Sequence, residues 1–201
     1  MPQSHCKQLL RVERPNDVRF LTFSCNHRLS LFSNAKVCDT FADHLDAARL
    51  KHNFHLYAWV IMPEHVHLLL WPCLPAHPVA AVLHDLKRAF AAEVIRRWRG
   101  LNAPILTRLE TKRGHIRFWQ TGGGYDRNIF TTEEFNEKLR YIHLNPVTRG
   151  LVVRPEDWKW SSARWYAGDR TSPVSLDPLP PRKPSALPTP PPPQSAVQSR
   201  G

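Results

Sequence analysis

The sequence predicts an α+β fold, a ferredoxin-like sandwich in which helices pack on an antiparallel sheet. Apolar segments typical of strands alternate with segments at helical spacing, in the order strand, helix, strand, strand, helix, strand, helix. The second and third strand segments are separated by Pro63 and Glu64 alone, as in a β-hairpin. We expect one domain over residues 11–169 and a disordered, proline-rich tail over residues 170–201.

The first half of the predicted domain contains three strands and one helix. Residues 17–25, DVRFLTFSC, are rich in β-forming side chains and predict the first strand. Residues 36–54 place apolar side chains near helical spacing, which predicts a helix. Residues 54–62 and 65–71 form the two arms of the hairpin. The expected apolar stripe of the helix consists of Val37, Phe41, Leu45 and Leu50.

The second half predicts two longer helices around a glycine-rich turn. Residues 78–100 carry an apolar stripe and end at Gly100. Residues 115–130, HIRFWQTGGGYDRNIF, predict a strand, a turn and a further strand or loop. The last helix opens with the capping box Thr131 and Glu134, and we expect it to end at Pro146.

The tail is predicted from composition. The last 31 residues, from Thr171 onward, hold 10 of the 19 prolines and no aromatic residue. Such a segment buries too little apolar surface to offset the entropy of the chain. Docking of an unknown partner on this tail is left open.

Charge favours a polyanionic partner. The net charge is +11 and the isoelectric point is about 10.0. A solvated helix face is the alternative interpretation of the most basic stretch. Nine basic residues lie between positions 84 and 117, namely Lys87, Arg88, Arg96, Arg97, Arg99, Arg108, Lys112, Arg113 and Arg117.

Cysteine usage and hydropathy favour a cytoplasmic protein. The four cysteines form no C-x-x-C pair, so neither structural zinc nor a disulfide framework is supported. No apolar run reaches the ~18 residues that a membrane span needs. We therefore expect no membrane association.

Two histidines stand in the most apolar part of the chain. His65 and His67 are two positions apart, so both rings lie on the same face of the predicted strand. Val66, Leu68 and Leu70 form the other, purely apolar face, which must be the core side. The pair is suited to binding a metal or a phosphate, or to closing the edge of a core.

The last helix adds two polar positions off its core stripe. Tyr141 and Asn145 lie one turn apart on the same face. Taken alone, they also fit a rim tyrosine and an Asn-Pro helix stop. Together with His65 and His67, Asn145 would complete a ligand set of two nitrogens and one oxygen for a divalent ion, with positions open for a phosphodiester. A tyrosine hydroxyl one turn away is then a candidate nucleophile.

Five stretches of the chain resemble a known family. PEHVHLLLWP, LKRAF, FWQTGGGYDRNI, YIHLNPVTRGLV and WKWSSARWY are similar to those of single-tyrosine HUH transposases, in the branch associated with repetitive extragenic palindromes (REP). The resemblance runs from about Arg19 to Tyr166. It implies that His65 and His67 bind the metal, that Asn145 assists and that Tyr141 is the nucleophile.

The resemblance also implies an activity and a partner. Members of this family cut and rejoin single-stranded DNA at the foot of a hairpin, using Mg²⁺ or Mn²⁺ and a 5′-phosphotyrosine intermediate. The expected substrate is therefore hairpin or palindromic single-stranded DNA, and the expected location is the nucleoid. Related enzymes include dimers and monomers, which leaves a homodimer open. Whether the protein is still mobile or serves its host is not decided by these residues.

The DNA surface is expected along the basic stretch and around the glycine turn. Taken alone, Gly122–Gly124 predict only a tight turn. The family resemblance implies in addition that the glycine backbone could approach DNA. Trp119 would stack on unpaired bases. The candidate DNA-binding residues are Lys87, Arg88, Arg117, Trp119 and Arg127.

Other classes of protein fit the sequence less well. A non-catalytic module that binds hairpin DNA for its host is the main alternative, although the tyrosine and both histidines are present. A His-x-His-x-His hydrolase is disfavoured because Leu69 occupies the third position, and a two-histidine phosphoesterase lacks its second motif. Among the four tyrosines, Tyr125 is the next candidate nucleophile after Tyr141, since Tyr57 lies in an apolar strand and Tyr166 lies near the tail.

Overall fold

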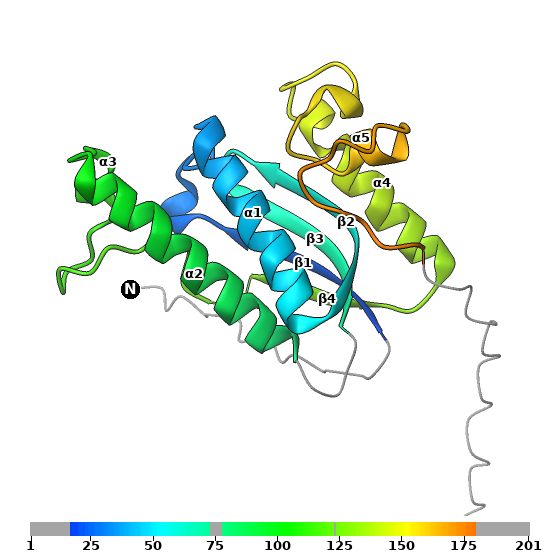
Figure 1. Ribbon diagram of the computed structural model, residues 1–201, viewed down its shortest axis with the longest axis horizontal. Coiled ribbons are helices and arrows are strands. Elements are labelled where there is room, and N and C mark those ends of the chain that lie inside the picture. Colours follow the sequence, from blue (N-terminus) through cyan, green and yellow to red (C-terminus); the bar gives the residue numbers. More distant parts are fainter. Residues whose placement is uncertain (1–16, 73–77, 123, 180–201) are drawn as a thin grey trace, which may run out of the picture.

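The computed structural model describes residues 17–72, 78–122 and 124–179. Its centre is a four-stranded antiparallel sheet with the strand order β2-β3-β1-β4 (Figure 1). Helices pack on the sheet, so the predicted α+β architecture is confirmed. The strands are β1 (Val18–Ser24), β2 (Phe54–Met62), β3 (His65–Pro72) and β4 (Tyr125–Ile129).

Strand β3 lies inside the sheet, between its hairpin partner β2 and the first strand β1. The register pairs His67 with Thr22 and His65 with Ser24. Because directly opposed residues of antiparallel strands point to the same face, these four side chains share one side of the sheet.

One face of the sheet carries the larger core. Helices α1 (Ala35–His52) and α2 (Val79–Gly100) run side by side across this face in Figure 1. The short helix α3 (Ile105–Leu109) follows α2. Their apolar stripes pack on Leu21, Phe23, Val66, Leu68 and Leu70. The purely apolar face of β3 therefore points into the core, as predicted.

The opposite face carries helix α4 (Thr132–Thr148) over a smaller core. Phe135 and Ile142 of the predicted stripe are buried there. The capping box is confirmed, since Thr131 Oγ1 accepts the Glu134 N–H and the Glu134 carboxylate accepts the N–H of Phe130. Because the larger core covers the other face, helix α4 lies on the histidine face of the sheet.

Three local expectations were wrong. Leu50 is 68% exposed, and Ala48 takes the inner position in its place. Helix α4 continues through Pro146 for a further half turn, because proline removes only one N–H donor and the Arg149 N–H still reaches the Asn145 carbonyl at 3.0 Å. The segment before the glycine turn forms isolated bridges, such as the one between Trp119 and Cys25, but no strand.

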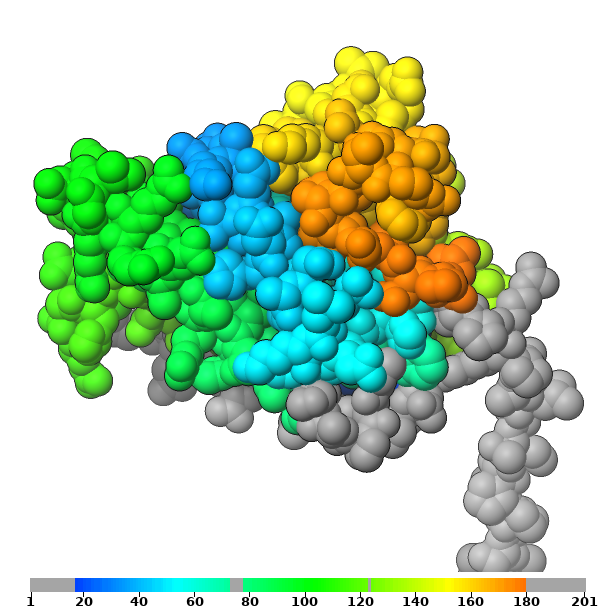
Figure 2. All heavy atoms as spheres, viewed as in Figure 1, coloured from blue at the N-terminus to red at the C-terminus, as the bar shows by residue number. Residues whose placement is uncertain are grey.

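The packed part of the chain continues beyond the expected boundary at residue 169. Val174 and Leu176 are buried, and Asp177 Oδ2 accepts the backbone N–H of Leu56 at 2.8 Å and pairs with Arg49 at 3.2 Å. Figure 2 shows this segment in orange against α1 and β2 in cyan. Residues 170–179 are therefore part of the domain, whereas residues 11–16 and 180–201 of the predicted division lie outside the described residues.

Two 3₁₀ turns and a short helix complete the described chain: η1 (Asn26–Arg28), η2 (Pro155–Asp157) and α5 (Ala163–Tyr166). Among the described helices, none combines the length and the apolar composition that a bilayer crossing requires.

Candidate active site

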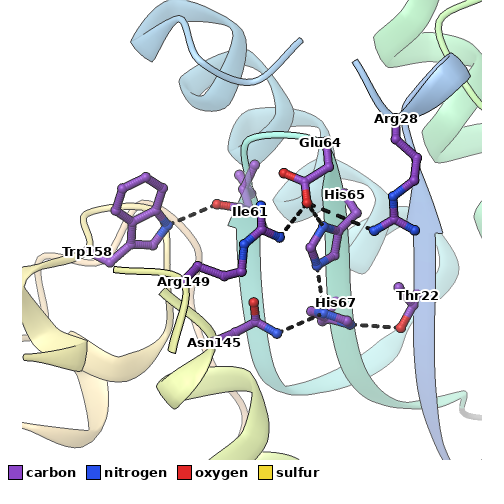
Figure 3. Close-up of polar contacts among 9 residues, drawn as sticks. All are labelled: Thr22, Arg28, Ile61, Glu64, His65, His67, Asn145, Arg149 and Trp158. Carbon is purple, nitrogen blue, oxygen red and sulfur yellow. Dashed lines mark hydrogen bonds and ion pairs between the residues drawn. The ribbon is translucent and has the colours of Figure 1, made fainter. Parts of the chain in front are cut away.

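The two histidines converge on a single point. His65 and His67 are 6% and 3% exposed, and their Nε2 atoms are 2.9 Å apart (Figure 3). Residues two apart on a strand place their side chains on one face, and the pleat of β3 brings these two rings edge to face at 4.6 Å between centroids. Both Nε2 atoms therefore face the same small volume beside α4.

Each histidine is held from its other ring nitrogen. His65 Nδ1 lies 3.1 Å from the Glu64 carboxylate, and His67 Nδ1 lies 2.7 Å from the hydroxyl of Thr22. Metal-binding histidines are typically oriented in this way, through a hydrogen bond at the nitrogen that does not bind the metal. Register accounts for the second contact, because Thr22 is the cross-strand partner of His67.

Burial keeps both rings neutral. Burial, with a smaller effect of the neighbouring His65, lowers the pKa of His67 from 6.5 to about 3. Burial also lowers the pKa of His65, and it outweighs the opposing charge of Glu64. A metal ligand must offer a lone pair, so rings that stay neutral at pH 7 are suited to that role.

Asn145 approaches the same point from α4. Its side-chain amide lies 3.2 Å from His67 Nε2, and the residue is 9% exposed. The amide nitrogen faces His67, and rotation of the amide by half a turn places Oδ1 at that position instead. The structure therefore brings together all three predicted ligands, although Asn145 follows His67 by 78 residues in the sequence.

The donor set fits a divalent ion. Two ligands at right angles, each about 2.1 Å from an ion, are about 3 Å apart, which matches the separation of the two Nε2 atoms. Within the described part of the chain, no group of three or more His, Cys, Asp and Glu residues could hold a metal. A site here depends on the Asn145 amide as its third ligand, and two imidazoles and one amide suit Mn²⁺ as well as Mg²⁺.

The tyrosine of α4 stands beside the histidines and is open to solvent. Tyr141 is 48% exposed, and its ring contacts His67 at 5.3 Å and Phe20 at 5.9 Å between centroids. It lines a cleft of about 1010 Å³ that is also lined by His65, His67 and Asn145. A cleft of this size accepts a nucleotide.

Tyr125, the second candidate nucleophile, lines the same cleft. It is 46% exposed, and its ring also contacts Phe20, at 5.9 Å between centroids. Tyr57 is buried in the smaller core, and the Tyr166 hydroxyl donates to the Tyr57 carbonyl at 2.9 Å. Burial raises the pKa of Tyr166 to about 12. Two of the four tyrosines are thus open to a substrate in the cleft.

Sequence reasoning missed the charged residues that surround His65. The buried carboxylate of Glu64 accepts a hydrogen bond from Arg149 at 2.6 Å, and Arg28 lies 3.9 Å away (Figure 3). Burial acts to raise the pKa of Glu64, but the hydrogen bond from Arg149 and neighbouring positive charge lower it below its usual value. Both arginines line the cleft. The available signal was a carboxylate directly before the histidine motif.

The predicted DNA-binding residues are scattered. Lys87 and Arg88 lie on α2, on the opposite face of the sheet from the cleft. Arg117 is exposed and donates to Thr121, and exposed Arg127 forms an ion pair with Glu134 of α4. None of these four cations is brought together with the histidines.

The predicted stacking role of Trp119 is wrong. Its side chain is 8% exposed, packs edge-on against Phe23 at 5.1 Å, and donates from Nε1 to the Lys87 carbonyl at 2.9 Å. An indole with its ring in the core and its N–H satisfied has no face free for a base.

The glycine turn also has a structural explanation. Gly124 has φ +69°, and a Cβ there would lie 2.1 Å from the Thr22 carbonyl oxygen. Only glycine allows β4 to begin so close to β1. At Gly124 the close backbone approach is to β1, the strand that carries Thr22, and Gly123 lies outside the described residues.

Comparisons with known proteins support the resemblance. No protein-family model matches the chain. Over 110 residues it is 27% identical to the REP-associated tyrosine transposase of Escherichia coli (strain K12), an alignment covering 54% of each protein. A Haemophilus influenzae protein that carries the same description provisionally is 30% identical over 111 residues, which cover 54% of this chain and 58% of the relative. The matched part thus spans about half the length of these curated relatives.

A solved structure shows the same fold. It is described as a REP-associated tyrosine transposase bound to a REP hairpin, and it superimposes with a TM-score of 0.63 at 18% identity. The match covers 83% of this chain and 87% of that one. The predicted resemblance is therefore confirmed: the chain is similar in sequence to proteins named REP-associated tyrosine transposases and shares the fold of one of them.

Proposed function

We propose that this protein cuts and rejoins single-stranded DNA at hairpin or palindromic sites, with Tyr141 as nucleophile and His65, His67 and Asn145 as the site of a divalent ion. The observation that carries the proposal is the convergence of these four residues in one cleft. The similarity to proteins named REP-associated tyrosine transposases supports the substrate class.

In this proposal, strand β3 provides the two histidines that hold the ion, and helix α4 provides the nucleophile. Strand β3 is buried on both faces, so His65 and His67 are held rigidly, while the exposed side of α4 presents Tyr141 to the cleft. A divalent ion bound between the histidines would supply positive charge to a phosphodiester oxygen, which makes the phosphorus easier to attack. Arg28 and Arg149 add positive charge on the same side of the cleft.

Cleavage transfers the 5′-phosphate of the strand from the 3′-oxygen to Tyr141. The Tyr141 hydroxyl loses its proton to solvent and its oxygen attacks the phosphorus of the scissile bond. The bond between phosphorus and the 3′-oxygen breaks, and that oxygen takes up a proton from solvent to become a free 3′-hydroxyl. The 5′-phosphate stays attached to Tyr141. Attack by a second 3′-hydroxyl reverses the step and joins the strands without an external energy source.

The test is adduct formation on a labelled hairpin oligonucleotide, read on a denaturing gel. The wild-type chain should form a covalent protein–DNA product with Mg²⁺ or Mn²⁺ and none in EDTA. Tyr141→Phe should form none, whereas the matched variant Tyr125→Phe, altered in the same cleft, should retain it.

Each outcome distinguishes between explanations. An adduct with Tyr141→Phe but not with Tyr125→Phe would move the nucleophile to β4. Hairpin binding without any adduct in the wild-type chain would favour a non-catalytic DNA-binding module. Full cleavage in EDTA would exclude the metal site.

A further inference from the structure

Glu64 is the most highly connected charged group next to the candidate metal site. It is 5% exposed, and one carboxylate oxygen meets His65, Arg149 and Arg28 at 3.1, 2.6 and 3.9 Å. Figure 3 shows this oxygen at the centre of the three side chains. A buried carboxylate is costly unless it is paired and hydrogen-bonded, so this arrangement requires an explanation.

The contact with His65 sets the tautomer of that ring. An ionised carboxylate only accepts hydrogen bonds, so His65 must carry its proton on Nδ1, and its Nε2 keeps a free lone pair. That lone pair lies 2.9 Å from His67 Nε2, at the point where an ion would be held between the two rings. The Thr22 hydroxyl lies 2.7 Å from His67 Nδ1 and can donate to that nitrogen or accept from it, so it is compatible with either tautomer of His67.

The two histidines therefore differ in whether their contacts already impose the tautomer that binds an ion through Nε2. If His67 carries its proton on Nε2, it must move that proton to Nδ1 before it can bind an ion through Nε2, and the Thr22 hydroxyl must then accept the hydrogen bond from Nδ1. His65 needs no such change, because Glu64 already fixes the required tautomer. The hydroxyl of Thr22 can serve either role, whereas the Glu64 carboxylate permits only one.

The contact with Arg149 connects the strand to the tyrosine helix. Arg149 is the residue after α4, and its backbone N–H donates to the Asn145 carbonyl at 3.0 Å. Its side chain crosses to Glu64 at the start of β3. One carboxylate thus holds the ligand on the strand and the end of the helix that carries Asn145 and Tyr141.

We propose that Glu64 is a positioning residue that presets the tautomer of His65 for metal binding. The inference rests on the metal site of the proposed function. The competing explanation is that Glu64 only neutralises Arg149, in which case loss of either partner should have the same effect.

The test is calorimetric titration of Mn²⁺ into the full chain at neutral pH, with Glu64→Gln, Arg149→Gln and His65→Ala. The glutamine at position 64 keeps the shape, but its amide can donate as well as accept, so the tautomer of His65 is no longer imposed. We expect affinity to fall about 10- to 100-fold in Glu64→Gln. We expect a much smaller change in Arg149→Gln, where Arg28 still neighbours the carboxylate, and no binding in His65→Ala.

Ring ¹⁵N spectra of the metal-free wild-type chain give a second readout that does not depend on a variant folding. His65 should carry its proton on Nδ1. A proton on Nε2, or a Glu64→Gln variant that binds Mn²⁺ like the wild type while His65→Ala does not, would overturn the role of Glu64 and leave the metal site intact. Equal losses in Glu64→Gln and Arg149→Gln would support the purely structural ion pair instead. Absence of binding in the wild type would remove the proposed metal site itself.

Discussion

A pair of matched arginines tests on which face of the sheet the DNA lies. Arg140 precedes Tyr141 on α4 and lines the cleft, and Arg88 lies on α2, on the opposite face of the sheet. Both side chains are exposed, and neither has an ion-pair partner among the described residues. Arg140→Gln and Arg88→Gln therefore remove the same charge from the same kind of position, and neither should disturb the fold.

The magnitude follows from counterion release. Each phosphate contact on a single strand contributes a slope of about 0.7 to the plot of log affinity against log salt. Loss of one contact should therefore weaken binding about fivefold at 0.1 M salt and flatten the slope by about 0.7. We expect this result for Arg140→Gln, because a strand attacked by Tyr141 must pass the neighbouring residue.

Fluorescence anisotropy on a labelled hairpin with a single-stranded flank, in EDTA and between about 50 and 200 mM salt, measures both quantities. Arg88→Gln should match the wild type, which revises the sequence-based expectation for that residue. A flatter slope for Arg88→Gln, together with an unchanged slope for Arg140→Gln, would place the DNA along α2 and refute binding in the cleft.

Three further predictions concern stability. Trp119→Ala should lower the free energy of unfolding by about 3–5 kcal/mol in urea titrations, because it empties a core position; an unchanged midpoint would contradict its place in the core. Asp177→Ala should cost about 1–3 kcal/mol, since it leaves the Leu56 N–H without its acceptor; wild-type stability would mean that residues 170–179 do not dock. Burial lowers the pKa of His143 from 6.5 to about 4, so the unfolded chain takes up this proton first, and stability should fall by up to about 3 kcal/mol as the pH drops from about 6.5 to 4. His143→Gln should show a shallower loss over that window, and identical pH profiles would contradict the assignment.

Local periodicity accounts for the part of the site that the sequence could predict. In β3, alternation separates His65 and His67 from an apolar face, so the direction of both rings follows once that face is assigned to the core. In α4, Phe135 and Ile142 define the buried stripe, which leaves Tyr141 turned toward solvent. These features depend on neighbours a few residues away, where periodicity is informative.

Contacts across the sheet and between sheet and helix were beyond such reasoning. The pairing of Thr22 with His67 depends on strand register, and that of Glu64 with Arg149 on the end of a helix 85 residues later. Composition also does not show whether a residue is buried or exposed. Trp119 beside a glycine turn fits a stacking platform and a core position equally well. A proline-rich average over residues 171–201 concealed the short docking segment around Val174.

The position of the candidate site follows from the different constraints on its two elements. Strand β3 is buried on both faces and paired on both edges, so its histidines have little freedom to move. Helix α4 is fixed by one apolar stripe and lies open to solvent on the other side, which is where a nucleophile must meet a long substrate. If Tyr141 attacks a phosphodiester held at the histidines, the angle between helix and strand must stay within about 10–20° of the reactive geometry. The ion pair between Glu64 and Arg149 and the contact of Asn145 with His67 both lie at the C-terminal end of α4, where Ile142 and Pro146 are also buried. Polar contacts thus supplement apolar packing at the end of the helix that faces the histidines.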